Sequence, residues 1–248
     1  PLCAALAAAT RLEGETLQRI TLTVVGAVGE ETPSSPGARH VLRTHAPPDL
    51  LIVGEPSGWE GITLGYKGRL GMTVHAVREN FHSAAAGQTA AEAVVVAWND
   101  LTAWRDGFNG GRQRLFDQVQ LSLQGIESSG DGLQQDCRAS VNVRLPVDLG
   151  PDEARSSLHA VLPAGVSGTF SGGEAAYRSE RDSPLIRAFR TAIRDVGGTP
   201  RLKLKTGTSD MNVVGPVWGV PAAAYGPGDS SLDHTPDEHV EMAELEDR

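Results

Sequence analysis

The sequence predicts an α/β protein made of two domains, one inserted into the other. Near-continuous apolar runs at residues 20–28 and 49–54 are typical of strands covered on both faces in a mostly parallel sheet. From residue 67 to residue 173, strand and helix patterns follow the order β-α-β-β-α-β, which is the ferredoxin-like order. We therefore expect an outer domain from residues 1–66 and 174–248 and an inserted domain from residues 67–173.

In the outer domain, a helix that opens with proline is expected within residues 1–14. The apolar runs 20–28 and 49–54 follow as strands, separated by proline residues and a short helix. A helix at 183–198 ends at two glycines, and the apolar run 221–225 leads to a last helix with good capping chemistry.

In the inserted domain, each strand alternates between apolar and polar residues, which predicts one wet face and one buried face. The helix at 83–104 carries a broad apolar stripe, and a second helix opens at Pro151. The four strands are the segments YKGRLGMTVHAV, DQVQLSLQGI, CRASVNVRLP and GVSGTFSGG.

Composition excludes several classes of protein. The 248 residues carry a net charge of −9, which argues against nucleic acid as the main partner because phosphate binding needs a basic face. No apolar stretch approaches the roughly 20 residues of a membrane helix, and these 248 residues contain no pattern typical of a secretory signal. Two cysteines without a CxxC motif suggest neither a disulfide framework nor a thiolate zinc site. We expect a cytoplasmic protein whose chain is clipped at both ends.

Acidic residues and a histidine follow three of the predicted outer-domain strands. Glu30 and Glu31 come after the first, Glu55 comes after the second, and His234 lies beyond the run 221–225. Ligands bind at the carboxyl ends of strands in open parallel sheets, and oxygen and nitrogen donors suit a divalent metal. A metal would also relieve the repulsion between Glu30 and Glu31.

Each feature also has an ordinary explanation when taken alone. A Glu-Glu pair in a loop is most often solvated, Gly-Glu-Pro is a common turn, and a single histidine before a capping box is usually a surface residue. Only their joint placement after three strands favours a metal site.

Five motifs carry a resemblance that runs from one end of the chain to the other: GAVGEE, IVGEPSGWEGITLGYKG, FHSA, KTGTSDMN and GPGDSSLDHTPDEHVEM. Together they resemble the family of dinuclear metallo-deacylases and carboxypeptidases that contains acetylornithine deacetylase and succinyl-diaminopimelate desuccinylase. The motifs are most similar to those of members that release lysine, and often ornithine, from an amino-group carrier protein in amino-acid biosynthesis. The resemblance implies a metallopeptidase-like catalytic domain and an inserted lid domain that also mediates dimerisation.

The resemblance implies a role for several of these residues. Glu30 would be the general base, Glu31 and His234 would bind one divalent zinc or cobalt ion, and Glu55 would bind the other. His82 matches the lid histidine that donates to the developing oxyanion, typically from the neighbouring subunit of a homodimer. Without the resemblance, His82 reads as a surface residue that precedes a helix.

Four residues are candidates for substrate binding. Arg144 can bind a carboxylate with two parallel hydrogen bonds, although an arginine on the wet face of a strand is an equally ordinary reading. Lys205, Thr208 and Ser209 lie in a loop expected to line the substrate pocket. An acidic carrier protein would need a local basic patch, for which Lys67, Arg69, Lys203 and Lys205 are candidates.

The family pattern is incomplete in these 248 residues, because its His-x-Asp segment and its bridging aspartate have no counterpart here. We therefore expect little bound metal and little activity from this chain. Two alternatives stay open: a different substrate, such as acetylornithine, another N-acyl amino acid or a small peptide, and a non-catalytic relative that dimerises through the lid domain.

Overall fold

The structure is a computed structural model that describes residues 2–12, 14–32, 34–82, 84–233 and 235–246. The chain divides into two compact units. Unit 1 comprises Pro1–Tyr66, Tyr177–Lys205 and Ser209–Arg248, and unit 2 comprises Lys67–Ala176 and Thr206–Thr208. No helix in the described ranges is both long enough and apolar enough to cross a lipid bilayer.

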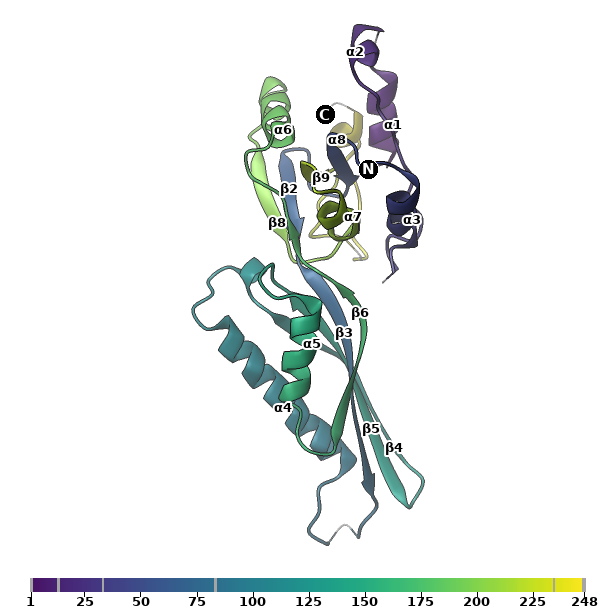
Figure 1. The fold of residues 1–248 in the computed structure, drawn as a ribbon, viewed down its shortest axis with the longest axis vertical. Coiled ribbons are helices and arrows are strands. Elements are labelled where there is room, and N and C mark those ends of the chain that lie inside the picture. Colours follow the sequence, from purple (N-terminus) through teal and green to yellow (C-terminus); the bar gives the residue numbers. More distant parts are fainter. Residues whose placement is uncertain (1, 13, 33, 83, 234, 247–248) are drawn as a thin grey trace. The chain divides into compact units, whose positions relative to one another are not determined.

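Unit 1 combines helices with a small sheet (Figure 1). Its helices are α1 (Leu2–Thr10), α2 (Gly14–Arg19), α3 (Pro36–Thr44), α6 (Pro184–Asp195), α7 (Asp210–Trp218) and α8 (Met242–Glu246). Its strands are β1 (Leu51–Gly54), β2 (Gly61–Tyr66), β7 (Tyr177–Arg178), β8 (Arg201–Lys205) and β9 (Ala222–Tyr225).

The sheet of unit 1 is mixed. Its order is β1-β9-β2-β7, and β8 also pairs with β2. The pairs β1–β9 and β2–β8 are parallel, whereas β2 runs antiparallel to both β9 and β7. The prediction of a mostly parallel sheet is therefore wrong. Continuous apolar runs report that both faces of a strand are covered, as in β2, where all six residues are buried, but they do not encode strand direction.

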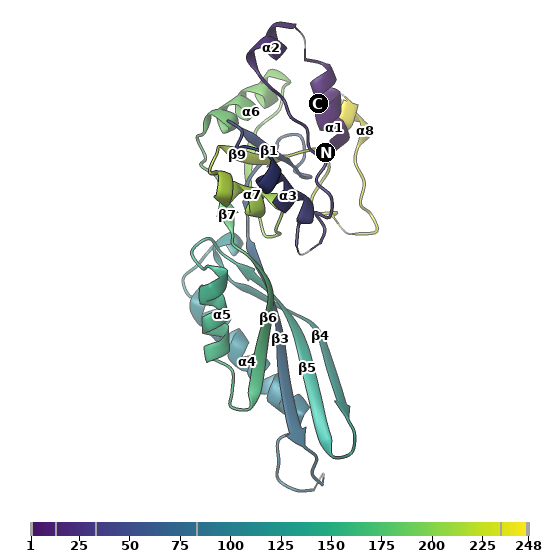
Figure 2. The same ribbon diagram turned by 45° about the vertical axis from the view of Figure 1, so that its right-hand side comes forward.

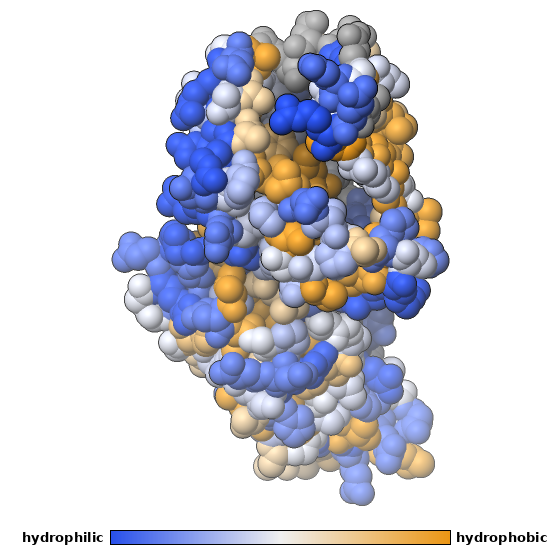
Figure 3. Space-filling view, turned by 45° about the horizontal axis from the view of Figure 1, so that its top comes forward, coloured by the Kyte–Doolittle hydropathy of each residue, from blue (hydrophilic) through white to orange (hydrophobic). Residues whose placement is uncertain are grey.

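The segment 20–28, predicted to be a strand, forms no strand in the structure. It is extended and irregular, every residue in it except Val24 is exposed, and Val28 is 73% exposed. None of the described strands pairs with it. Helix α1, which lies before α2 in the chain, also has no buried residue, and Figure 3 shows apolar side chains on the surface of the molecule. Apolar sequence favours a strand, but a strand also needs a neighbour for its backbone hydrogen bonds.

Two groups of buried side chains hold the sheet of unit 1. Ile62 and Leu64 of β2 pack with Leu185, Ile186 and Ile193 of the amphipathic helix α6. On a second side, Met211 of α7 packs with Tyr66, Ala222 and Ala224. Helices α6 and α7 thus fix β2 and β9. The loops of the candidate site leave β9 and its parallel neighbour β1.

Unit 2 has the element order β-α-β-β-α-β that the sequence predicts. Its elements are β3 (Gly68–Glu79), α4 (Ala90–Asn109), the 3-10 helix η1 (Leu115–Asp117), β4 (Gln120–Gly130), β5 (Gln134–Leu145), α5 (Pro151–Ala160) and β6 (Val166–Glu174). The strands form an antiparallel sheet of order β4-β5-β3-β6. Helices α4 and α5 lie on one face of this sheet (Figures 1 and 2).

The alternating pattern of the strands explains the core of unit 2. Leu70, Met72 and Val74 of β3 are buried against α4, and Cys137 of β5 is fully buried in the same core. Helix α4 begins after residue 89 rather than at residue 83, because the Thr89 hydroxyl and the Glu92 carboxylate cap its first turn reciprocally. The opposite face of the sheet is polar.

Candidate active site

Two loops leave the same edge of the sheet of unit 1. Strands β1 and β9 are parallel neighbours whose last residues, Gly54 and Tyr225, are paired. Glu55 starts the first loop, and its N–H donates to the Tyr225 carbonyl at 3.4 Å. The second loop continues to Asp233. The carboxyl ends of parallel strands thus bring these two acidic segments to one edge, where such sheets bind ligands.

Glu55 lies in a strongly acidic environment. The pKa of its carboxyl group is raised to about 8, first by burial and then by the charge of Glu30. Lys205 acts against this shift, and Asp210 and Asp233 add to it. Carboxylates gathered in this way repel one another, and a positive ion bound among them would relieve that repulsion.

Glu30 follows a turn that glycine permits. Gly29 has a φ of 71°, a conformation that favours glycine. Gly37, in the first turn of α3, donates to the Val28 carbonyl at 3.0 Å, and a Cβ at Gly37 would approach the Val28 nitrogen to 2.4 Å. This close packing restrains the backbone just before Glu30. The Glu30 side chain is half-buried. Glu31 is exposed.

Asp210 is a member of this acidic group that the sequence did not single out. It is the first residue of α7, is 8% exposed, and has a pKa raised by burial. Its Oδ1 atom is buried and has no hydrogen-bond partner among the described residues. Its position directly after a Ser cap in the KTGTSDMN motif was the only signal in the sequence.

The donor set fits a divalent cation in its chemistry. A positive ion would stabilise the charged form of the Glu55 carboxyl group, whose pKa is raised. It would also give the unpartnered Asp210 Oδ1 atom an interaction partner. Within the described ranges, however, no three His, Cys, Asp or Glu side chains are arranged to hold a metal. His234, the predicted imidazole ligand, lies outside the described residues. The assignment of Glu31, Glu55 and His234 as ligands stays a prediction.

Two lysines of β8 hold the loop that carries Glu55. The Lys203 ammonium donates to the Ser57 carbonyl at 2.6 Å, and the Lys205 ammonium donates to the Pro56 carbonyl. The Lys205 nitrogen also lies 5.7 Å from the centre of the Tyr66 ring. Burial lowers the pKa of Lys205, and nearby Glu55 opposes that effect. The described contacts of Lys205 therefore restrain the backbone of the loop that carries Glu55.

Ser209, predicted to line a substrate pocket, is buried at the start of α7. Its hydroxyl accepts from the Met211 N–H at 3.2 Å, and its own N–H donates to the Asn212 side chain at 3.0 Å. These bonds form a capping box that starts α7 and thereby places Asp210.

Arg144 and Thr208, two further candidates, are brought together in unit 2. The guanidinium donates to the Thr208 hydroxyl at 2.8 Å. Burial lowers the pKa of Arg144, and the neighbouring charge of Arg69, its register partner on β3, lowers it further. Two adjacent guanidinium groups suit an anionic ligand.

Lys67 is not part of a surface patch. It is fully buried, and its ammonium donates to the carbonyls of Leu115, at 3.0 Å, and Gln118. The expectation of a basic mouth that includes Lys67 is therefore wrong. The ammonium group of a lysine between two strands can donate its hydrogen bonds to main-chain oxygens of a nearby loop. The local sequence does not show which loop will supply those oxygens.

His82 lies in the loop between β3 and α4 of unit 2 and is exposed. Its Nδ1 accepts from the Ala84 N–H at 3.2 Å. No described residue tests its predicted role in a neighbouring subunit, so that role stays a prediction.

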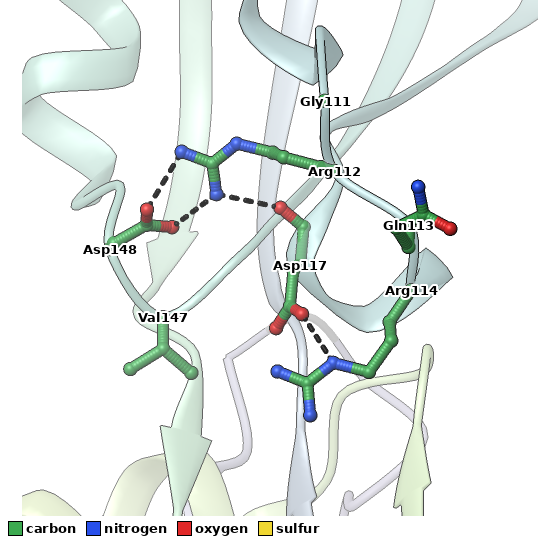
Figure 4. A pocket seen from close by; sticks show the side chains of 7 residues that line it. All are labelled: Gly111, Arg112, Gln113, Arg114, Asp117, Val147 and Asp148. Carbon is green, nitrogen blue, oxygen red and sulfur yellow. Dashed lines mark hydrogen bonds and ion pairs between the residues drawn. The ribbon is translucent and has the colours of Figure 1, made fainter.

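A pocket of about 440 Å³ in unit 2 is not part of the candidate site (Figure 4). Its arginines are already paired: Arg112 binds both oxygens of Asp148, at 3.0 and 2.8 Å, and Arg114 binds Asp117 at 2.6 Å. The lining residues are Gly111, Arg112, Gln113, Arg114, Asp117, Val147 and Asp148. None of the predicted site residues is among them.

Comparison with known proteins gives one consistent result. The pattern that defines peptidase family M20/M25/M40 matches residues 1–248. The [LysW]-lysine hydrolase of Deinococcus radiodurans is 47% identical over 99% of this chain and 68% of its own length. The putative [LysW]-lysine/[LysW]-ornithine hydrolase of Pyrococcus horikoshii is 38% identical over 88% of this chain and 60% of its own.

A solved structure shows the same fold. The aminopeptidase PepT of Bacillus cereus matches 88% of this chain and 59% of its own, with a TM-score of 0.66 and 14% identity. The chain thus spans roughly three-fifths to two-thirds of the length of the relatives it matches.

Proposed function

Because the chain belongs to peptidase family M20/M25/M40, we propose that it is a metal-dependent amidohydrolase that releases lysine or ornithine from an amino-group carrier protein. The observation that carries the substrate is the 47% identity to a [LysW]-lysine hydrolase over 99% of this chain. The acidic group around Glu55 supports the metal dependence, which is typical of the family.

The proposed chemistry uses the residues of the sheet edge. Divalent ions, two zinc or cobalt ions in our proposal, supply Lewis acidity at the amide carbonyl when they are bound. Glu31, Glu55 and His234 are proposed to hold them. Glu30 takes a proton from the attacking water and returns it to the leaving amine nitrogen. The half-buried position of Glu30 beside Glu55 supports this role.

Unit 2 is proposed to bind the substrate and to form a dimer. Arg144 and Thr208 hold a carboxylate of the substrate, and His82 donates to the oxyanion that forms in a second subunit. In unit 1, Lys205 and Ser209 shape the loops of the candidate site. We propose that residues 1–66 and 174–248 form the catalytic domain, and that residues 67–173 form a ferredoxin-like domain that serves as a lid and as the dimerisation surface. The antiparallel sheet with both helices on one face supports the lid assignment. A homodimer in the cytoplasm completes the proposal.

The test compares substrates on a purified form of the protein that also carries the family's His-x-Asp segment and bridging aspartate, with zinc or cobalt added. Lysine-loaded carrier protein, N-acetyl-lysine and N-acetyl-ornithine are supplied in parallel, and the free amino acid is measured by mass spectrometry. We expect kcat/KM to be at least about tenfold higher for the carrier-bound lysine, because only that substrate uses contacts beyond the scissile amide. A preference for an acetylated amino acid would overturn the substrate, and no release from any of the three would overturn the enzymatic role.

A further inference from the structure

A carboxylate near the end of the chain joins the two loops of the candidate site. Glu244 of α8 accepts a hydrogen bond at 2.6 Å from the N–H of Trp59 through Oε1. Its other oxygen, Oε2, accepts from the N–H of Gly228 at 3.2 Å. Trp59 lies in the loop after β1 and Gly228 in the loop after β9, so a single side chain spans both.

The two loops are already paired up to this point. Ser57 donates from its N–H to the Gly226 carbonyl at 3.0 Å, and Gly58 donates to the Gly228 carbonyl at 2.8 Å. The fully buried Ser57 hydroxyl accepts from the Gly226 N–H at 3.2 Å and donates to the Gly61 carbonyl at 2.8 Å. The parallel pairing of β1 and β9 therefore continues beyond the strands and ends at the Glu244 carboxylate.

We propose that Glu244 is a positioning residue that fixes the spacing between the Glu55 loop and the loop that continues to Asp233, so that a divalent ion is held between them. The inference deepens the proposed function and rests on it for the identity of the ion. Trp59 is separated from Glu55 by only three residues, so the hydrogen bond at Trp59 restrains the backbone of the proposed ligand. Contacts one step removed from a metal commonly tune its binding in this way.

The two hydrogen bonds require a carboxylate. Both Glu244 oxygens accept, and both partners are main-chain donors. A glutamine would keep one acceptor and turn an NH2 donor toward the second N–H, which would then lack a partner. Glu244 is half-buried, so water replaces the lost acceptor incompletely.

The experiment compares Glu244→Gln with Glu241→Gln in a purified form of the protein that also carries the family's His-x-Asp segment and bridging aspartate. Glu241 lies three residues away, is 78% exposed at its side chain and pairs with His239 at 3.6 Å, so its variant makes the same charge change at an exposed position. Zinc affinity is measured by competition with a chelator. Amide hydrogen exchange of the metal-free protein is measured by mass spectrometry on peptides that cover residues 57–60 and 226–229.

We expect Glu244→Gln to weaken zinc binding about 10- to 100-fold and to speed exchange in both loops, while Glu241→Gln changes neither by more than about twofold. Glu244→Asp keeps both acceptor oxygens and should recover part of the affinity, which a general loss of folding would not allow. Unchanged exchange in the loops, or faster exchange with unchanged zinc affinity, would overturn the positioning role. A wild-type protein that binds no zinc contradicts the proposed function instead, and the exchange measurement tells the two failures apart.

Discussion

The Arg144 guanidinium donates to the Thr208 hydroxyl at 2.8 Å, and that hydroxyl donates in turn to the Lys67 carbonyl at 3.0 Å. The bonds tie strand β5 to the residue that precedes β3 and hold the guanidinium beside Arg69. Burial and the charge of Arg69 both disfavour the charged form of Arg144. An anionic group that bound here would relieve that cost, because opposite charge favours the ionised form.

Replacing Arg144 by alanine should therefore weaken the binding of a substrate that carries a carboxylate. A charged hydrogen bond contributes about 1.5–3 kcal/mol, so kcat/KM should fall about 10- to 100-fold, mainly through KM. Steady-state kinetics on the carrier-bound substrate measure this. The matched control is Arg138→Ala, because Arg138 lies on the same strand but is 61% exposed at its side chain. Equal losses in both variants would contradict the assignment.

Replacing Glu30 by glutamine should remove the proposed general base while keeping the size of the side chain. We expect kcat to fall by about 10²–10⁴ with metal content unchanged. Turnover and elemental analysis of the same samples separate the base from a ligand. Glu15→Gln, at an exposed position of α2, serves as the charge control. Turnover that survives in Glu30→Gln would remove Glu30 from the mechanism.

The lowered pKa of the buried Lys67 ammonium predicts that the free energy of unfolding depends on pH. Its pKa is lowered to about 8, first by burial and then by the charge of Arg144, while Asp117 opposes the shift. Between about pH 8 and the ordinary lysine pKa near 10.4, the unfolded chain holds a proton that the folded chain has released. Because the unfolded state binds more protons there, the free energy of unfolding from this group rises with pH.

Urea unfolding of the wild type and of Lys67→Met at several pH values tests this. The wild type should gain stability relative to the variant by at most about 1.4 kcal/mol per pH unit across that window. Below about pH 8 the difference should stay constant, since lysine is then charged in both states. A difference that is flat over the whole range would show that Lys67 keeps an ordinary pKa.

The core of unit 2 gives a prediction of stability alone. Leu70 is fully buried between β3 and α4, and Leu70→Ala should cost about 2–5 kcal/mol through lost contacts and a cavity. Leu133 is 79% exposed, so Leu133→Ala should change the free energy of unfolding by less than about 0.5 kcal/mol. Chemical denaturation monitored by circular dichroism measures both. Similar losses in the two variants would mean that Leu70 is not packed as described.

Periodicity in the sequence was most informative in unit 2. The alternation through Leu70, Met72 and Val74 fixes which face of β3 meets a helix, so both the elements and the core could be read from the chain. In unit 1, by contrast, the apolar run 20–28 meets no strand, and the direction of β2 depends on long-range pairing that a local pattern does not contain.

Parts of the candidate site were visible in the sequence, and other parts were not. Glu30 and Glu55 are each ordinary when taken alone, and they stand out only because both follow apolar runs of the same predicted domain. Asp210 looked like part of an ordinary cap, and only folding reveals its unpartnered oxygen. The role of Glu244 was equally hidden, because Trp59 and Gly228 contribute main-chain groups that carry no side-chain signature.

The two cysteine thiols differ in solvent exposure, so their reaction with a thiol reagent can reveal local opening of the fold. Cys3 is exposed, whereas Cys137 of β5 is fully buried in the core of unit 2, and burial raises the pKa of its thiol. A thiol reagent therefore labels Cys3 at once and reaches Cys137 only when the sheet of unit 2 opens. The rate at which Cys137 is labelled therefore measures how often that sheet opens, without any engineered probe.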